Sequence, residues 1–300
     1  MTPSVHKNLA DRFNVNVFGE GATTLLLVHG FGCNQAMWVL LIEQLQRRIQ
    51  PQTPHIATVA TPATQKSQGQ FRFVLMDLMG CGAADSSAYD ATRYASLDGY
   101  VDDVLEVAAS LKQDGGRLVL VCHSVGAAIC LAASLKAPEL AAAQVLVAPS
   151  PCFLNDGDYP GGFEREHIDT IIETMHSNRR LWAENFSTLV VGGTTRPQLA
   201  DEFVESYCST YEPAAIQFAL LTFLVDQRAD LAGVSIPTLL LQALHDPLAS
   251  VAVGEFMHRQ IAQSVLSLID DTGHSPHLTA PDQCALSIGN FLASLDSEPI

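Results

Sequence analysis

The sequence predicts an α/β fold built on a mostly parallel, doubly wound sheet, and three observations support this. Short apolar runs of strand length alternate with segments of helical periodicity along most of the chain. One such run leads through a serine directly into a helix of small residues. Strand signals then vanish from residue 151 to residue 233, where amphipathic helical patterns take over. We therefore expect a core formed by residues 1–150 and 234–300, with a helical lid inserted at 151–233.

Seven strands are expected from the apolar runs. They are Asn14–Phe18, Thr24–Val28, Phe71–Met76, Leu118–Cys122, Gln144–Val147, Thr238–Gln242 and Val265–Ile269. Helices are expected between them, one capped by Asn34 with Trp38 on its buried face, and another capped by Ser96 and carrying Val101. The alternation of strands and helices predicts a parallel sheet that helices cover.

The segment around Ser124 has the context of a nucleophile elbow. A β-branched run that ends at Cys122 is followed by His123-Ser124 and at once by a helix of small residues that includes Gly126. An elbow lifts a serine Oγ clear of the sheet through a strained strand-to-helix turn, so its neighbours must be small. Cys122 departs from the usual G-x-S-x-G pattern, and a plain turn with Ser124 as helix cap is the alternative. The pattern favours a catalytic serine.

Downstream residues complete a triad in the chain order serine, acid, histidine. Asp246 follows the strand predicted at Thr238–Gln242, and His274 follows the strand predicted at Val265–Ile269. In such a triad the histidine takes the serine proton, and the acid orients the histidine. The order and spacing therefore predict a serine hydrolase.

Each partner of the serine has an alternative. Asp246 precedes a proline and could be only a turn residue. Asp270 and Asp271 compete for the acid role but lie too close in sequence to the histidine, and His277 competes as the base. His274, His277 and Asp246 could instead bind a metal, but no further cluster has metal-site spacing. We expect no metal and no organic cofactor.

A serine hydrolase also needs an oxyanion hole, which backbone amides form. Val125, the residue after the serine, supplies one candidate N–H. The strand at Thr24–Val28 runs into the sequence HGFG at residues 29–32, where the Phe31 N–H is the second candidate. These glycines do not predict a dinucleotide site, because the third glycine of that motif is missing.

Longer motifs resemble one group of α/β-hydrolases. The segments that carry the resemblance are His29–Trp38, Tyr89–Asp103, His123–Gly126, Ser150–Asp156, Tyr159–Glu164 and Gly273–Pro281. They are similar to segments of the family that holds the bacterial energy-stress regulator RsbQ and the plant strigolactone and karrikin receptors, and they extend over nearly the whole chain. Gly126 and residues 150–152 and 208–210 favour RsbQ within this family. The resemblance implies an α/β-hydrolase fold whose lid has four helices.

The resemblance also implies a function. It implies a serine hydrolase that acts on a small hydrophobic ester or lactone, with Ser124, His274 and Asp246 as catalytic residues. A carbon–carbon bond hydrolase or a perhydrolase would use the same residues. An alternative function, of a different class, is that of a ligand receptor with slow hydrolysis, whose lid recruits a regulatory protein partner. The expected substrate-binding residues are Phe31, Phe153, Trp182, Phe186, Phe218 and Leu248. The aromatic residues among them could equally form the core of the lid.

Composition limits which binding partners and which cellular compartment are expected. The net charge of −16 makes nucleic acid and anionic membranes poor partners, because phosphate binding needs clustered Lys and Arg. The seven cysteines are scattered without C-x-x-C pairs, and residues 1–11 lack an apolar signal region, so we expect a cytoplasmic protein with reduced thiols. Residues 50–70 are rich in Gln, Thr and Pro, which predicts a flexible surface insert or a segment translated through an error of gene prediction.

Overall fold

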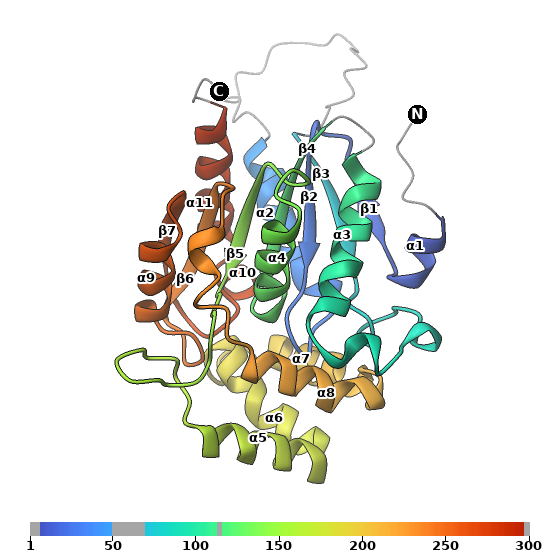
Figure 1. Ribbon diagram of the computed structural model, residues 1–300, viewed down its shortest axis with the longest axis vertical. Coiled ribbons are helices and arrows are strands. Elements are labelled where there is room, and N and C mark those ends of the chain that lie inside the picture. Colours follow the sequence, from blue (N-terminus) through green and yellow to red (C-terminus); the bar gives the residue numbers. More distant parts are fainter. Residues whose placement is uncertain (1–6, 50–69, 113–115, 297–300) are drawn as a thin grey trace, which may run out of the picture.

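A seven-stranded sheet forms the centre of the computed structural model, which describes residues 7–49, 70–112 and 116–296 (Figure 1). The strand order is β1-β3-β2-β4-β5-β6-β7. β1 pairs antiparallel with β3, and the other neighbouring pairs are parallel. The strands are β1 (Asn16–Phe18), β2 (Thr23–Val28), β3 (Phe71–Met76), β4 (Arg117–His123), β5 (Ala143–Val147), β6 (Thr238–His245) and β7 (Ser264–Thr272). The predicted fold class is confirmed, and the insert predicted at residues 50–70 lies, except for Gln70, outside the described residues.

The ends of three strands differ from the prediction by more than one residue. β6 and β7 each continue three residues further, because they keep pairing across a register shift between Ala243 and His245. The acidic residue after β6 therefore follows the strand directly. At the other edge, β1 starts only at Asn16, because Asn14 has a φ of 46° and its side chain donates to Asp77 at 2.8 Å.

Helices cover both faces of the sheet (Figure 1). Those of the core are α1 (Lys7–Arg12), α2 (Val39–Ile49), α3 (Asp98–Lys112), α4 (Val125–Lys136), α9 (Val251–Gln260), α10 (Pro276–Thr279) and α11 (Pro281–Leu295). α3 packs against α4, and α2 packs against α11. Asn34 caps the short 3₁₀ turn Gln35–Trp38 that leads into α2, and Ser96 accepts a hydrogen bond from the N–H of Asp98 at 3.2 Å. No helix among the described residues has both the length and the apolar character needed to cross a membrane.

Four helices lie between β5 and β6, and we call them the four-helix insertion. They are α5 (Arg165–Ser177), α6 (Arg179–Val191), α7 (Pro197–Ser209) and α8 (Glu212–Leu224). Figure 1 shows them together at one end of the sheet. Arg179 of α6 ties this group together, since its guanidinium donates to the carbonyl oxygens of Tyr207 and Thr210 at 2.6 and 2.7 Å.

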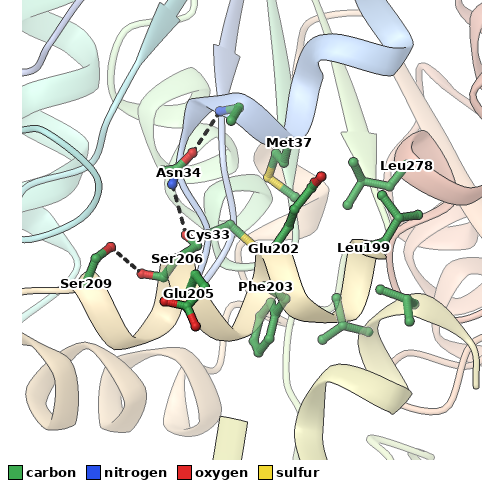
Figure 2. Close-up of a pocket in the computed structure, with 13 residues that line it drawn as sticks. Cys33, Asn34, Met37, Leu199, Glu202, Phe203, Glu205, Ser206, Ser209 and Leu278 are labelled. Carbon is green, nitrogen blue, oxygen red and sulfur yellow. Dashed lines mark hydrogen bonds between the residues drawn. The ribbon is translucent and has the colours of Figure 1, made fainter. Parts of the chain in front are cut away.

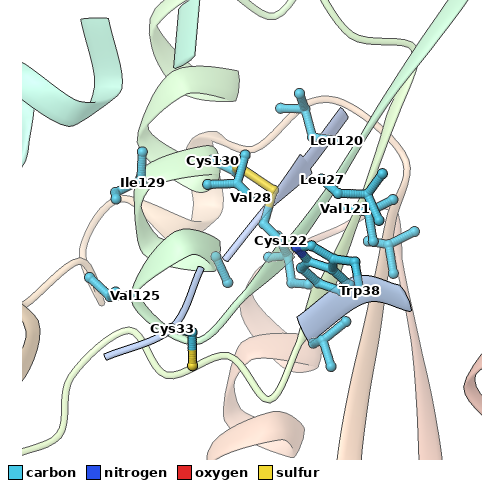
Figure 3. Packing of buried hydrophobic residues seen from close by; sticks show 14 of the residues in the cluster. Leu27, Val28, Cys33, Trp38, Leu120, Val121, Cys122, Val125, Ile129 and Cys130 are labelled. Carbon is cyan, nitrogen blue, oxygen red and sulfur yellow. A yellow bond between two sulfur atoms is a disulfide. The ribbon is translucent and has the colours of Figure 1, made fainter. Parts of the chain in front are cut away.

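A disulfide corrects the expectation that all thiols are reduced. Cys122, at the end of β4, is bonded to Cys130 of α4, and both are fully buried (Figure 3). The two cysteines are eight residues apart in sequence, but the strand-to-helix turn brings their Cα atoms to 6.6 Å. The side chain that departs from the glycine of the elbow pattern is therefore a covalent link between strand and helix. The remaining cysteines, Cys33, Cys81, Cys152, Cys208 and Cys284, are free.

Candidate active site

Ser124 occupies a strained turn between β4 and α4. Its φ of 54° and ψ of −121° lie in a region that residues with a Cβ rarely adopt. The surroundings explain why only small neighbours fit. A Cβ at Gly126 would lie 2.5 Å from the His29 carbonyl oxygen, and one at Gly30 would lie 2.4 Å from Nδ1 of His123. The turn thus has the geometry of a nucleophile elbow.

Ser124, His274 and Asp246 form a chain of short hydrogen bonds. His274 Nε2 is 2.8 Å from Ser124 Oγ, and His274 Nδ1 is 2.8 Å from Asp246 Oδ2. All three side chains are buried, and they follow β4, β7 and β6 respectively. Because the carboxylate only accepts hydrogen bonds, Nδ1 carries the proton and Nε2 is free to accept the serine proton.

The Asp246 carboxylate is held by several donors besides the histidine. Oδ1 accepts from the N–H groups of Leu248 and Ala249 at 2.8 and 3.0 Å, and Oδ2 accepts from Gln242 at 3.2 Å. A buried carboxylate is stable only when its oxygens are paired in this way. This network fixes the carboxylate in the orientation that contacts His274.

The competing acids lie elsewhere. Asp270 is exposed, and its backbone pairs with the side chain of Gln283. Asp271 pairs with Arg196 at 3.0 Å and accepts a hydrogen bond from Thr279. The structure therefore brings Asp246, and neither of these aspartates, to the histidine.

Two further histidines pack behind His274. His123 Nε2 is 2.9 Å from the His274 carbonyl oxygen, so His123 donates this hydrogen bond. His277 lies between the rings of Trp38 and His123, at centroid distances of 4.6 Å to each. Burial lowers the pKa of His123 well below its usual value and lowers the pKa of His277 to about 3. Both are therefore neutral near pH 7, and His277 does not contact the serine.

The backbone of His274 is also tied to the four-helix insertion. Its N–H donates to the Val190 carbonyl oxygen at 3.0 Å, at the end of α6. Just beyond, Gly192 has a φ of 76°, and a Cβ there would lie 1.8 Å from the Thr272 carbonyl oxygen. The position of His274 thus depends on the insertion as well as on the sheet.

A small, mostly apolar cavity lies above Ser124, and we call it the inner cavity. Of the predicted substrate-binding residues, it is lined by Phe31, Phe153, Phe186 and Leu248. Besides the triad, six further lining residues were not among the predicted substrate-binding residues; these are Cys33, His123, Val190, Phe203, Thr222 and Phe223. Helical periodicity marks such residues as buried, but it does not say which of them face a cavity rather than each other.

Trp182 and Phe218 differ from the prediction, because they pack behind the cavity wall and do not line it. Their rings contact Phe31 at centroid distances of 6.0 and 5.8 Å. Trp182 is stacked on Phe186 at 4.6 Å, and Phe218 is stacked on Tyr100 at 4.6 Å. Both rings therefore lie one layer further out than Phe31, which lines the cavity.

The two predicted oxyanion-hole amides lie on the segments that border the serine. Val125 is the first residue of α4, so its N–H has no acceptor within the helix. Phe31 follows Gly30, whose backbone packs so closely on Ser124 that a Cβ would lie 3.2 Å from the serine Cβ. His29 braces this loop by accepting the Leu78 N–H at 2.9 Å. Among the described residues, no group of three or more His, Cys, Asp and Glu side chains could hold a metal ion.

Comparison with known proteins identifies the family of this chain. The model of the alpha/beta hydrolase family matches residues 25–286. The chain is 32% identical to Karrikin insensitive 2 receptor CA of Petunia hybrida, covering 90% of this chain and 91% of that protein. It is 31% identical to Strigolactone esterase D14 of Arabidopsis thaliana, covering 93% and 95%. The structure of a hydrolase from Oleispira antarctica superposes with a TM-score of 0.84 at 33% identity, covering 96% and 97%. The chain therefore belongs to the α/β-hydrolase family.

Proposed function

We propose that this protein is a carboxylic-ester hydrolase that acts on a small hydrophobic ester or lactone. The observation that carries the proposal is the Ser124–His274–Asp246 chain, with two hydrogen bonds of 2.8 Å beneath an aromatic cavity. Residues 151–233 act as the lid over a core formed by residues 1–150 and 234–300. The hydrophobic lining favours an uncharged substrate, since few polar groups besides the triad face the cavity.

The proposed reaction follows from the roles that the geometry allows. Ser124 Oγ attacks the carbonyl carbon while His274 Nε2 takes its proton, and Asp246 stabilises the resulting imidazolium. The N–H groups of Phe31 and Val125 stabilise the negative charge that develops on the carbonyl oxygen. His274 then protonates the departing alcohol. Water, deprotonated by His274, releases the acid and restores the serine.

A second candidate function is that of a ligand receptor with slow hydrolysis. The supporting observation is the hydrogen bond from the His274 N–H to the Val190 carbonyl oxygen, which links the reacting histidine to the four-helix insertion. A relative carries the name of a receptor. In this case a regulatory protein would bind the four-helix insertion only in the presence of ligand.

The cytoplasmic location stays a prediction. The Cys122–Cys130 disulfide weighs against it, because disulfides persist mainly in oxidising compartments. Counting free thiols in the denatured, unreduced protein addresses the question: five per chain correspond to the disulfide form, and seven to the fully reduced form.

The function is tested with the wild type, Ser124→Ala and the matched surface control Ser177→Ala. We expect wild type and control to hydrolyse 4-nitrophenyl acetate, and Ser124→Ala to lose this activity while keeping its circular dichroism spectrum. A butenolide strigolactone analogue is then offered to the same proteins. Fast turnover supports an enzyme, and turnover far below about 1 per second supports the receptor alternative. Retained acetate hydrolysis in folded Ser124→Ala would refute the proposal.

A further inference from the structure

A second, larger pocket adjoins the inner cavity, and we call it the outer pocket. It lies between the start of α2 and helix α7, where Met37 and Leu278 of the core face Leu199 and Ser206 of the insertion (Figure 2). Its volume is about 380 Å³, whereas the inner cavity measures about 20 Å³. A volume of the latter size holds little more than one water molecule, while small-molecule sites typically begin near ~300 Å³.

The two spaces share one wall. Three residues line both of them, namely Cys33, Val190 and Phe203. The backbone of two of these is fixed, since the Cys33 N–H donates to Gly30 and the Val190 carbonyl accepts from His274.

Phe203 contributes the one aromatic ring of this three-residue wall. Its ring has no hydrogen bond to lose, and it packs on Phe186 and Tyr207 at centroid distances of 6.0 and 6.4 Å. It also rests on the backbone of Gly32, where a Cβ would lie 2.9 Å from Cζ of the ring. Rotation of this ring would join the two spaces beside Ser124.

The lining of the outer pocket indicates what it binds. The polar side chains on one side are already paired, because Asn34 donates to Ser206 at 3.1 Å and Ser209 donates to the Ser206 carbonyl at 2.7 Å. The charged groups in the lining are the carboxylates of Glu202 and Glu205. Glu205 is bridged to Arg180 at 2.7 Å. Apolar walls favour an apolar chain, and the carboxylates at the rim disfavour an anionic one.

We propose that the outer pocket binds the longer, uncharged apolar arm of the substrate, and that Phe203 is the partition through which this arm passes from Ser124. The preferred substrate is then an elongated ester or lactone whose far end carries no carboxylate or phosphate. This inference rests on the hydrolase function proposed above.

The test compares two tryptophan substitutions on α7. Glu202→Trp fills the outer pocket, and Asp201→Trp, at an exposed position outside its lining, removes the same charge and introduces the same side chain. The measured quantity is the ratio of kcat/KM for a long ester to that for 4-nitrophenyl acetate within each protein. The long esters are 4-nitrophenyl octanoate for the acyl arm and octyl acetate for the alcohol arm. A third long ester, the 4-nitrophenyl monoester of octanedioic acid, carries a terminal carboxylate.

We expect the ratio to fall about tenfold in Glu202→Trp relative to Asp201→Trp for at least one neutral long ester, because each buried methylene contributes roughly fourfold. Phe203→Ala should raise the same ratio. In the wild type, the octanedioic acid monoester, with its terminal carboxylate, should have a lower kcat/KM than 4-nitrophenyl octanoate. Equal ratios in the two tryptophan variants for both arms would overturn the proposal. Absence of acetate hydrolysis in the wild type would instead overturn the proposed function.

Discussion

The hydrogen-bonded chain at Ser124 and the four-helix insertion above it are built on different principles. Around Ser124, directional hydrogen bonds fix the reacting groups, and Asp246 alone accepts from four different donors. Around the substrate space, aromatic rings pack against each other, as where Phe31 contacts Trp182, Tyr207, Phe218 and Phe223. Directional bonds hold one geometry, while aromatic rings pack in either offset-stacked or edge-to-face arrangements. In the proposed hydrolase, we expect this difference to separate residues that determine the rate from residues that select the substrate.

Removing the charge of Asp246 should have the largest effect. Asp246→Asn should lower kcat for 4-nitrophenyl acetate by roughly 10²–10⁴, because an amide cannot stabilise the imidazolium of His274. KM should change little. The matched control is Asp271→Asn, which removes the charge of a competing aspartate that pairs with Arg196. Steady-state kinetics measure both effects, and a similar fall of kcat in both variants would contradict the assignment of Asp246 as the acid of the triad.

His123 should come next, as a residue that positions the His274 backbone through its 2.9 Å hydrogen bond. His123→Phe keeps an aromatic ring but loses the donor, and we expect kcat to fall roughly 10- to 100-fold, in line with the ~1–3 kcal/mol that a buried carbonyl left without its partner costs. His123→Gln places an amide donor near the same position and should recover part of the rate. If Phe were tolerated and Gln were not, the role of His123 would be packing alone.

The buried His277 should make stability depend on pH. Its pKa of about 3 lies below the ordinary value of 6.5, so the unfolded chain binds a proton that the folded chain refuses between these values. This contribution is present above pH 6.5 and is lost as the pH falls, by up to about 1.4 kcal/mol per pH unit. Between pH 7.5 and pH 5, the wild type should lose roughly 2 kcal/mol more than His277→Phe in urea unfolding. Parallel pH profiles would show that His277 is not held neutral.

A substitution in the aromatic region should have the smallest effect, and mainly on KM. Phe223→Leu removes a ring that contacts Phe31, Phe153 and Phe186, and we expect KM for a hydrophobic ester to rise roughly three- to tenfold with kcat nearly constant. Phe256→Leu, in α9 and outside the lining of the inner cavity, is the control. A large fall in kcat with unchanged KM would remove the distinction between the two regions.

The same difference explains what the sequence could predict. Ser124, Asp246 and His274 each follow a strand, and strands of a parallel sheet end at one edge, so their convergence follows from chain order. The seven strands were predictable from apolar runs, although the extra length of β6 and β7 depends on their mutual pairing. These features are local in sequence or follow from topology.

Contacts between distant segments were not predictable in this way. Trp182 and Phe218 were expected in the pocket, but they pack behind Phe31 and do not line the cavity. Phe203 and Phe223 line the cavity instead, and helical spacing alone cannot distinguish these positions. The Cys122–Cys130 disulfide was missed for another reason, since its cysteines are only eight residues apart but no C-x-x-C spacing marks them.

The central claim is that His274 and Asp246 activate Ser124, and covalent labelling tests it most directly. A fluorophosphonate that carries an uncharged alkyl group reacts with activated serines, and intact-protein mass spectrometry with peptide mapping locates the adduct. We predict one adduct on Ser124 of the wild type, a much slower reaction in Asp246→Asn, and none in Ser124→Ala. An adduct on another serine, or equal labelling rates in wild type and Asp246→Asn, would contradict the account.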